Sequence, residues 1–164
     1  MKWVKEYFIK KALDSRKENI GNNNPMENKN IKTVGIIATS KDEIEDIRKV
    51  VHSDLSEDIQ VFGWYYDENK NVDEQSFSYK DFTLFGKPGE KLNQFLSLQP
   101  DLIIFTFERL NYFTLYLLHL KPESYRMGFY SEEIKPFLDL MLNNEEKDIK
   151  SGTELLIKYL KQIN

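Results

Sequence analysis

The hydrophobic residues of this chain fall into short, nearly continuous runs that alternate with segments of helical periodicity. Runs of this kind occupy residues 33–38 (TVGIIA), 59–66 (IQVFGWYY) and 101–107 (DLIIFTF), and they are typical of strands buried on both faces of a sheet. Between the first two runs, apolar residues at helical spacing in residues 44–51 predict an amphipathic helix. Strands that alternate with helices in this way predict a parallel sheet covered on both faces.

Shorter patterns predict the remaining elements. Further strands are expected at residues 77–84, 125–130 and 138–143, and further helices between Pro88 and Pro100, at residues 110–120 and at residues 153–163. Right-handed crossovers leave few topologies for such a chain. We therefore expect one Rossmann-like α/β domain over residues 31–164, with a mostly parallel sheet of five or six strands and helices on both faces. The strands at residues 33–38 and 102–107 are expected at its centre.

An amphipathic N-terminal helix, assigned to residues 1–20, is expected to precede this domain. Its apolar side is expected to consist of Trp3, Val4, Tyr7, Phe8, Ala12 and Leu13. Residues 21–30 (GNNNPMENKN) contain a glycine, a proline and five asparagines, which predicts a linker.

Composition narrows the class of protein. The 164 residues favour a single domain, and 40% of them are hydrophobic, which is enough for a packed core. The chain has no cysteine, which excludes disulfides, thiolate metal sites and cysteine nucleophiles and fits a reducing compartment. The N-terminal residues lack the apolar region of a secretory signal. Charges interrupt the apolar stretch at residues 102–120, so no transmembrane segment is expected. Cytoplasm is the expected location.

Candidate ligand-binding residues follow the two central strands. In an open α/β sheet, ligands bind beyond the carboxyl ends of the strands, where the strand order reverses. This rule places Thr39, Ser40, Glu108, Arg109 and Asn111 around one crevice. The Glu108 carboxylate could take a proton or bind a hydroxyl, and the Arg109 guanidinium could hold a phosphate or carboxylate. The favoured interpretation is that both residues form the polar first turn of a buried helix.

Several kinds of site are disfavoured by the sequence. The first strand–helix turn, ATSKDEIEDI at residues 38–47, has no glycine, and its acidic residues would repel an anion at the helix N-terminus. We therefore expect no dinucleotide and no other cofactor. His52 and His119 lack ligand partners at suitable spacing, so no metal site is expected. Arg126 is expected in a structural ion pair with Glu108 or with a glutamate at residues 132–133.

Two segments leave alternatives open. Residues 81–90 (DFTLFGKPGE) could face a ligand, because glycine and lysine can cradle an anion. We favour a turn before a helix, with Phe82 and Phe85 in the core. The N-terminal helix could lie on an anionic membrane, contact RNA phosphates, or dock on the body or on a protein partner. Docking on the body or on a protein partner is favoured. The net charge of −4 gives no reason to expect binding of nucleic acid. The candidate partner-binding residues are Trp3, Tyr7, Phe8, Lys10 and Lys11.

Two resemblances add to this picture. The N-terminal KALDSRKEN, the loop DFTLFGKP and the pattern PDLIIF, YRMGFY and LDLML together resemble an uncharacterised family of small bacterial proteins. Residues 100–130 are also similar to part of the N-terminal Rossmann-like domain of heptosyltransferase-type glycosyltransferases. Those enzymes bind their nucleotide sugar with a second Rossmann domain, which these residues do not include, so the resemblance implies a fold rather than an activity.

The sequence therefore favours a non-catalytic binding or interaction module on a Rossmann-like scaffold, with a protein partner at the N-terminal helix. One alternative is an enzyme or sensor for a sugar phosphate or nucleotide in the crevice. The other is an RNA- or ribosome-associated protein that uses the basic side of the helix.

Overall fold

The fold is built around one parallel six-stranded sheet, in a computed structural model that describes residues 1–17, 30–69, 73–145 and 148–163. The strands are β1 (Thr33–Ala38), β2 (Gln60–Tyr66), β3 (Ser76–Phe77), β4 (Leu102–Phe105), β5 (Tyr125–Phe129) and β6 (Leu140–Leu142). Their spatial order is β3-β2-β1-β4-β5-β6, and every pairing is parallel. This is the order of the Rossmann fold. The predicted α/β class and the two central strands are confirmed.

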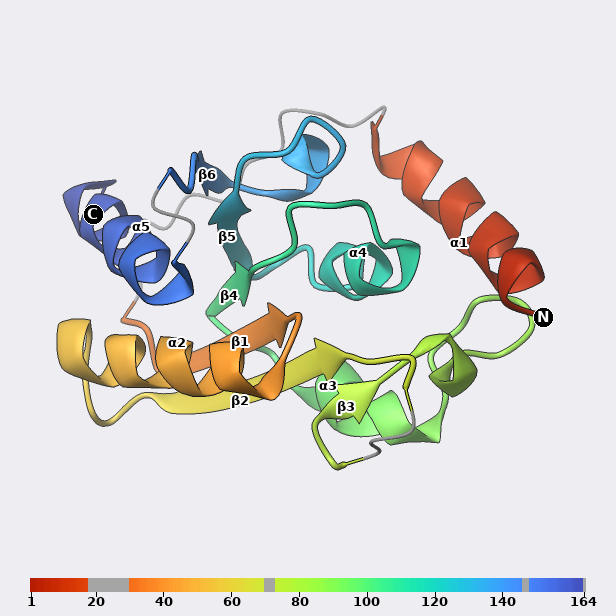
Figure 1. Cartoon of the computed structure of the whole chain (residues 1–164), viewed down its shortest axis with the longest axis horizontal. Helices are drawn as coiled ribbons and strands as arrows, with labels where there is room; N and C mark the ends of the chain where they lie inside the picture. The colour runs from red at the N-terminus through yellow and green to blue at the C-terminus, as the bar shows by residue number, and fades with distance from the viewer. Residues whose placement is uncertain (18–29, 70–72, 146–147, 164) are drawn as a thin grey trace.

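Helices cover both faces of the sheet, as predicted (Figure 1). The α-helices are α1 (Lys2–Lys17), α2 (Lys41–Asp54), α3 (Asn93–Ser97), α4 (Tyr112–His119) and α5 (Ile149–Ile163). The 3-10 helices are Tyr79–Asp81, Glu90–Leu92 and Lys135–Phe137. Helices α2 and α5 cover one face, and α3 and α4 cover the other, with α1 packed on the far side of α4 (Figure 1).

The alternation of side chains along each strand explains why the central strands are continuously apolar. In β1, Ile36 points into the core under α2 and α5, whereas the next residue, Ile37, points into the core under α4. Both side chains are fully buried. In β4, Ile104 likewise points into the core under α2 and α5, and Ile103 points into the core under α4. A central strand with helices on both sides must be apolar at every position, and burial of each such side chain contributes about 1.5–3 kcal/mol.

Several predicted elements have different extents in the structure. The third strand, expected over residues 77–84, is reduced to β3, because Ser78 and Asp81 form a reciprocal capping box that starts a 3-10 helix. The helix expected between Pro88 and Pro100 divides into a 3-10 turn and the short α3. The closing helix α5 begins at Ile149, four residues before the predicted start. The expected linker at residues 21–30 lies, except for Asn30, outside the described residues.

A buried ion pair joins β5 to the start of β6. The Arg126 side chain is 2% exposed, and its Nε atom lies 3.3 Å from Oδ2 of Asp139. The same carboxylate oxygen accepts the backbone N–H of Arg126 at 2.9 Å. The prediction of a structural ion pair for Arg126 was therefore correct in kind but wrong in its partner. Asp139 is the partner because β5 and β6 are neighbours in the sheet, whereas Glu108 lies in the crevice beyond β4.

Candidate functional site

A crevice of about 450 Å³ lies at the carboxyl ends of the central strands, where the strand order reverses. It is lined by Thr39, Glu43, Thr106, Phe107, Glu108, Arg109, Leu110, Asn111, Asn144 and Ile149. The structure thus brings four of the five predicted residues, Thr39, Glu108, Arg109 and Asn111, to one crevice. It forms because the chain leaves β1 toward α2 on one face and leaves β4 toward α4 on the other.

Ser40, the fifth predicted residue, does not line the crevice. Its side chain caps α2 and accepts the backbone N–H of Glu43 at 3.2 Å. Asn111 has a similar duty at α4, where its side chain accepts the backbone N–H of Thr114 at 3.1 Å. These two polar side chains are therefore engaged in holding helix N-termini.

The Glu43 carboxylate lines the crevice and links the ends of the two central strands. Its Oε1 atom accepts the backbone N–H of Thr39 at 2.9 Å and the hydroxyl of Thr106 at 2.8 Å. In Rossmann proteins the turn between the first strand and its helix is the place of a bound phosphate. Here an acidic side chain of the chain itself takes the backbone donor at that turn.

Glu43 was missed as a site residue, although the sequence contains a signal for it. Ser40 and Glu43 have the S-x-x-E spacing of a capping box, in which the glutamate turns back toward the residues before the helix. The structure shows this turn, with the carboxylate bonded one residue earlier than the capping serine. The capping pattern therefore predicts that the Glu43 side chain turns back toward the end of the preceding strand.

The remaining polar groups of the crevice have few partners. Glu108 and Arg109 are exposed at its rim, and neither forms an ion pair with another described residue. Asn144, which follows β6, was not predicted; its Oδ1 atom is buried and has no hydrogen-bond partner among the described residues. No group of three or more His, Asp or Glu residues in the described ranges could hold a metal ion. The crevice thus offers hydrogen-bond acceptors and one guanidinium.

The docking of α1 corrects the prediction about its apolar side. Helix α1 packs on α4 and on the 3-10 helix Tyr79–Asp81 through Ile9 and Leu13, which are 1% and 2% exposed. The expected docking residues Trp3 and Tyr7 are 70% and 60% exposed. Helix α1 therefore docks on the body as expected, but with Ile9, which was missed, and with its aromatic side turned outward.

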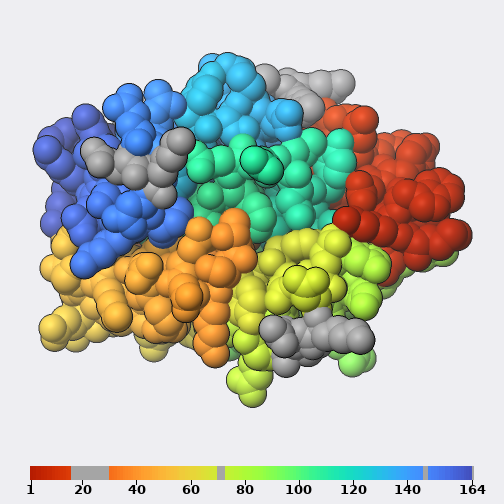
Figure 2. All heavy atoms as spheres, viewed as in Figure 1, coloured from red at the N-terminus to blue at the C-terminus, as the bar shows by residue number. Residues whose placement is uncertain are grey.

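The outward side of α1 continues onto the loop of residues 82–88. Phe8 lies in edge contact with Tyr7 and with Phe85, at ring-centre distances of 5.3 Å and 5.4 Å. We call the exposed group Trp3, Tyr7, Leu84 and Phe85 the aromatic surface. Figure 2 shows the end of the molecule that α1 occupies, with the segment near residue 85 beside it.

The loop of residues 81–90 forms a turn, as favoured, but only one of its aromatic side chains enters the core. Phe82 is buried, whereas Phe85 is 64% exposed. Gly86 has a φ of 80° and lies so close to α1 that a Cβ atom there would come within 2.8 Å of the Ile9 side chain. The backbone of the loop therefore packs directly against α1 at Gly86.

Two lysines of α1 bind the body, and others remain exposed. Lys2 forms an ion pair with Glu68 at 2.5 Å, which lowers the pKa of that carboxyl, with a smaller contribution from the Tyr66 hydroxyl. Lys5 donates to the carbonyl oxygen of Tyr79 at 3.1 Å. Both side chains therefore hold the N-terminal part of α1 against the body.

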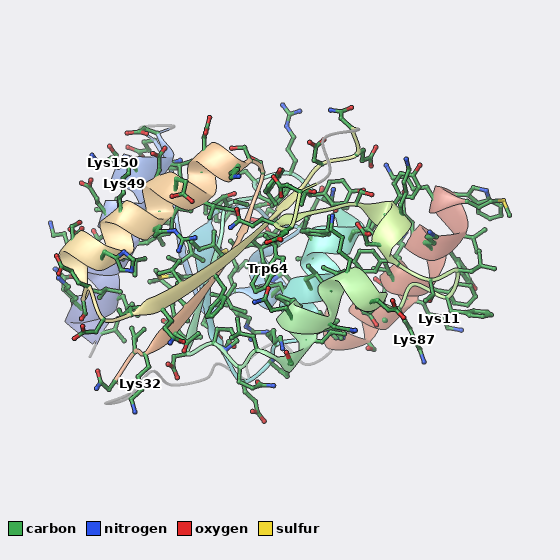
Figure 3. The ribbon with its side chains drawn as sticks, turned by 90° about the horizontal axis from the view of Figure 1, so that it is seen from below. Lys11, Lys32, Lys49, Trp64, Lys87 and Lys150 are labelled. Atoms are coloured by element: carbon green, nitrogen blue, oxygen red, sulfur yellow. The ribbon has the colours of Figure 1, made fainter. Side chains whose placement is uncertain are left out.

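Exposed lysines accompany the aromatic surface. Lys10, Lys11 and Lys87 are exposed. Figure 3 shows Lys11 and Lys87 at the same end of the molecule, with Lys49 and Lys150 at the opposite end. No helix within the described ranges is long and apolar enough to cross a membrane.

Comparison with known proteins assigns the chain to a family. No curated protein and no solved structure matches it, so the likeness of residues 100–130 to glycosyltransferases finds no support. A match to the family of unknown function DUF6913 extends over residues 5–163. Since this match covers nearly the whole chain and agrees with the resemblance noted from the sequence, the protein belongs to DUF6913.

Proposed function

We propose that this protein is a non-catalytic binding module on a Rossmann-like scaffold, which contacts its partner through the aromatic surface. The observation that carries the proposal is the exposure of Trp3 and Tyr7 on α1 and of Phe85 on the loop that contacts α1. Tryptophan and tyrosine are costly to leave in water and are enriched where proteins meet partners or membrane interfaces. Helix α1 is fixed to the body by Ile9 and Leu13, so the surface is presented on a rigid support.

The crevice supports a non-catalytic role. The backbone N–H of Thr39, which could bind a phosphate, is taken by Glu43, and the exposed Glu108 and Arg109 form no ion pair with another described residue. The lack of cysteine agrees with work in a reducing compartment such as the cytoplasm.

A photo-cross-linking experiment tests this proposal. A photoreactive phenylalanine derivative in place of Tyr7 is expected to label a partner in living cells. Because single hot-spot residues contribute about 2 kcal/mol or more, the added substitution Trp3→Ser should reduce the labelling at least about tenfold. The control places the same derivative at Tyr159, which is 42% exposed on α5.

Equal labelling from the two positions, or labelling that Trp3→Ser leaves unchanged, would contradict the proposal. Deletion of α1 is a poor substitute for these variants. It removes Ile9 and Leu13 from the core beside α4 and thereby changes stability as well as binding.

A second function, binding of a small sugar phosphate or nucleotide in the crevice, is favoured by one observation. Oδ1 of Asn144 is buried in the crevice wall without a donor, and buried polar groups are normally paired. A hydroxyl-bearing ligand with its anionic group at Arg109 would supply that donor.

Thermal unfolding with millimolar nucleotides and sugar phosphates tests the second function. A ligand at about ten times its Kd stabilises by about 1.4 kcal/mol, which for a chain of this length raises the melting temperature by about 3–6 °C. The variant Arg109→Gln should abolish the rise. Arg48→Gln should preserve it, because the Arg48 side chain donates to the Val61 carbonyl oxygen and does not line the crevice. No rise with any compound in the series would exclude this function.

A further inference from the structure

We infer that the partner of the aromatic surface is an anionic lipid bilayer. This inference rests on the proposed function, because it names the partner class of the same surface. It differs from the sequence-based expectation of a protein partner, and the difference comes from the charges around the surface.

The shape and chemistry of the aromatic surface suit the boundary of a bilayer. It is made by a helix and a neighbouring loop, which are joined through the Phe8 and Phe85 rings. Trp3 and Tyr7 have the amphipathic rings that lie at the level of lipid headgroups, and Leu84 and Phe85 are apolar side chains at the tip of a loop. Such a surface enters only the outer part of the bilayer and needs no spanning segment.

Two exposed lysines, Lys11 and Lys87, accompany the surface, although the chain as a whole has a net charge of −4. They lie on the same two segments as the aromatic side chains and at the same end of the molecule (Figure 3). Lys10 is also exposed, but it lines a hollow on the α4 side of α1 together with the acidic Asp14 and Glu133. The acidic Glu6 is half-buried and acts on Lys2, whose pKa is raised chiefly by Glu68 and in smaller part by Glu6. Each lysine near an anionic bilayer strengthens binding about fivefold, so Lys11 and Lys87 together strengthen it about twenty-five-fold.

The identity of these cations favours lipid over protein. Protein–protein interfaces are enriched in arginine and depleted in lysine. Membrane-binding surfaces use lysine readily, because its long chain extends along apolar surface while the ammonium group stays at the headgroups. The exposed cations beside the aromatic surface are Lys11 on α1 and Lys87 on the loop.

Vesicle flotation with the full chain tests the inference. The probes are vesicles of phosphatidylcholine alone and vesicles with about one-third phosphatidylglycerol, which carry the negative surface potential that attracts lysine. The protein is expected to float with the anionic vesicles at least about tenfold more than with the neutral ones. High salt should weaken the binding, because it screens these charges.

The two tryptophans provide a second measurement. Trp64 is 4% exposed and Trp3 is 70% exposed, so the variant Trp64→Phe leaves Trp3 as the only fluorescent indole. Its emission is expected to shift to shorter wavelength on addition of anionic vesicles, because the ring leaves water. Circular dichroism of this variant shows whether the substitution changes the fold, and flotation of the unaltered chain keeps the inference testable if it does.

Matched charge variants separate docking from general attraction. The pair Lys11→Glu and Lys87→Glu is expected to reduce flotation at least about tenfold. The pair Lys49→Glu and Lys150→Glu makes the same change in net charge at the opposite end, and should leave flotation within about twofold of the unaltered chain.

The inference is overturned if the unaltered chain fails to float with anionic vesicles at low salt, or if the two pairs of variants lose binding equally. Flotation could fail while the photoreactive group at Tyr7 still labels a protein and Trp3→Ser abolishes that labelling. In that case the lipid inference is wrong and the proposed function stands. Should both experiments fail, both are wrong.

Discussion

Replacing Asp139 by alanine is expected to lower the free energy of unfolding by about 3–5 kcal/mol, because it leaves a buried guanidinium without its counter-charge. Arg126 is 2% exposed, and Oδ2 of Asp139 accepts both its Nε–H and its backbone N–H. The Nη1 atom of Arg126 has no hydrogen-bond partner among the described residues. Loss of the carboxylate thus removes the only ion-pair partner that this cation has among the described residues. Urea denaturation followed by circular dichroism measures the change.

Two further variants sharpen this test. Asp58→Ala removes an exposed carboxylate in the turn after α2 and should change the free energy by no more than about 0.5 kcal/mol. Asp139→Asn keeps an oxygen acceptor but loses the charge, so its effect should lie between those of the other two. If Asp139→Ala came within about 1 kcal/mol of Asp58→Ala, the ion pair would have little part in stability.

Replacing Phe113 by alanine should lower the free energy of unfolding by about 3–5 kcal/mol. This side chain of α4 is 1% exposed, and its ring contacts those of Tyr66, Tyr79 and Phe82 at centre distances of 6.1, 6.3 and 5.1 Å. The alanine would leave a cavity between α4, the end of β2 and the segment on which α1 rests. The loss should therefore also loosen α1, which hydrogen exchange of its amides would detect.

Phe85→Ala is the matched control, since the same atoms are removed from a ring that is 64% exposed. Its cost should stay below about 1 kcal/mol. A similar loss from both substitutions would mean that the loop of residues 82–88 contributes to the core as much as α4 does, contrary to the burial of their side chains.

The sheet could be predicted from the sequence because its central strands face apolar helices on both sides. The runs at β1 and β4 have no polar interruption, so their position needed only the rule that such strands are buried. Edge elements were predicted less well. At β3, the side chains of Ser78 and Asp81 bond to the local backbone and stop the strand, which alternation of apolar residues does not reveal.

The orientation of α1 was not predictable from its apolar residues alone, since it has two apolar sides. Each residue advances about 100° around a helix, so Ile9 lies nearly opposite Tyr7. The aromatic side is larger, so it was predicted to be the docking side. In the structure, Ile9 and Leu13 are the residues buried against α4. The hydrophobic pattern shows that a side can be buried and does not show what buries it.

Some residues of the candidate site could be predicted from the sequence, and others could not. Thr39, Glu108 and Arg109 could be placed from the strand order, because the rule for open sheets locates their loops. Asn144 could not, because it reaches the crevice from beyond β6, and that approach depends on how β6 and α5 meet. Residues close to the central strands in sequence are thus predictable, whereas those contributed by distant segments need the structure.

The position of Glu43 has a consequence for any anion that approaches the crevice. A side chain held on the first turn of α2 acts as a tethered competitor, and its effective concentration at the Thr39 amide far exceeds the concentration of a free metabolite. A phosphate must displace this intramolecular occupant and also separate it from the Thr106 hydroxyl. The scaffold therefore keeps the strand order of a nucleotide-binding fold, while one of its own side chains occupies the anion position.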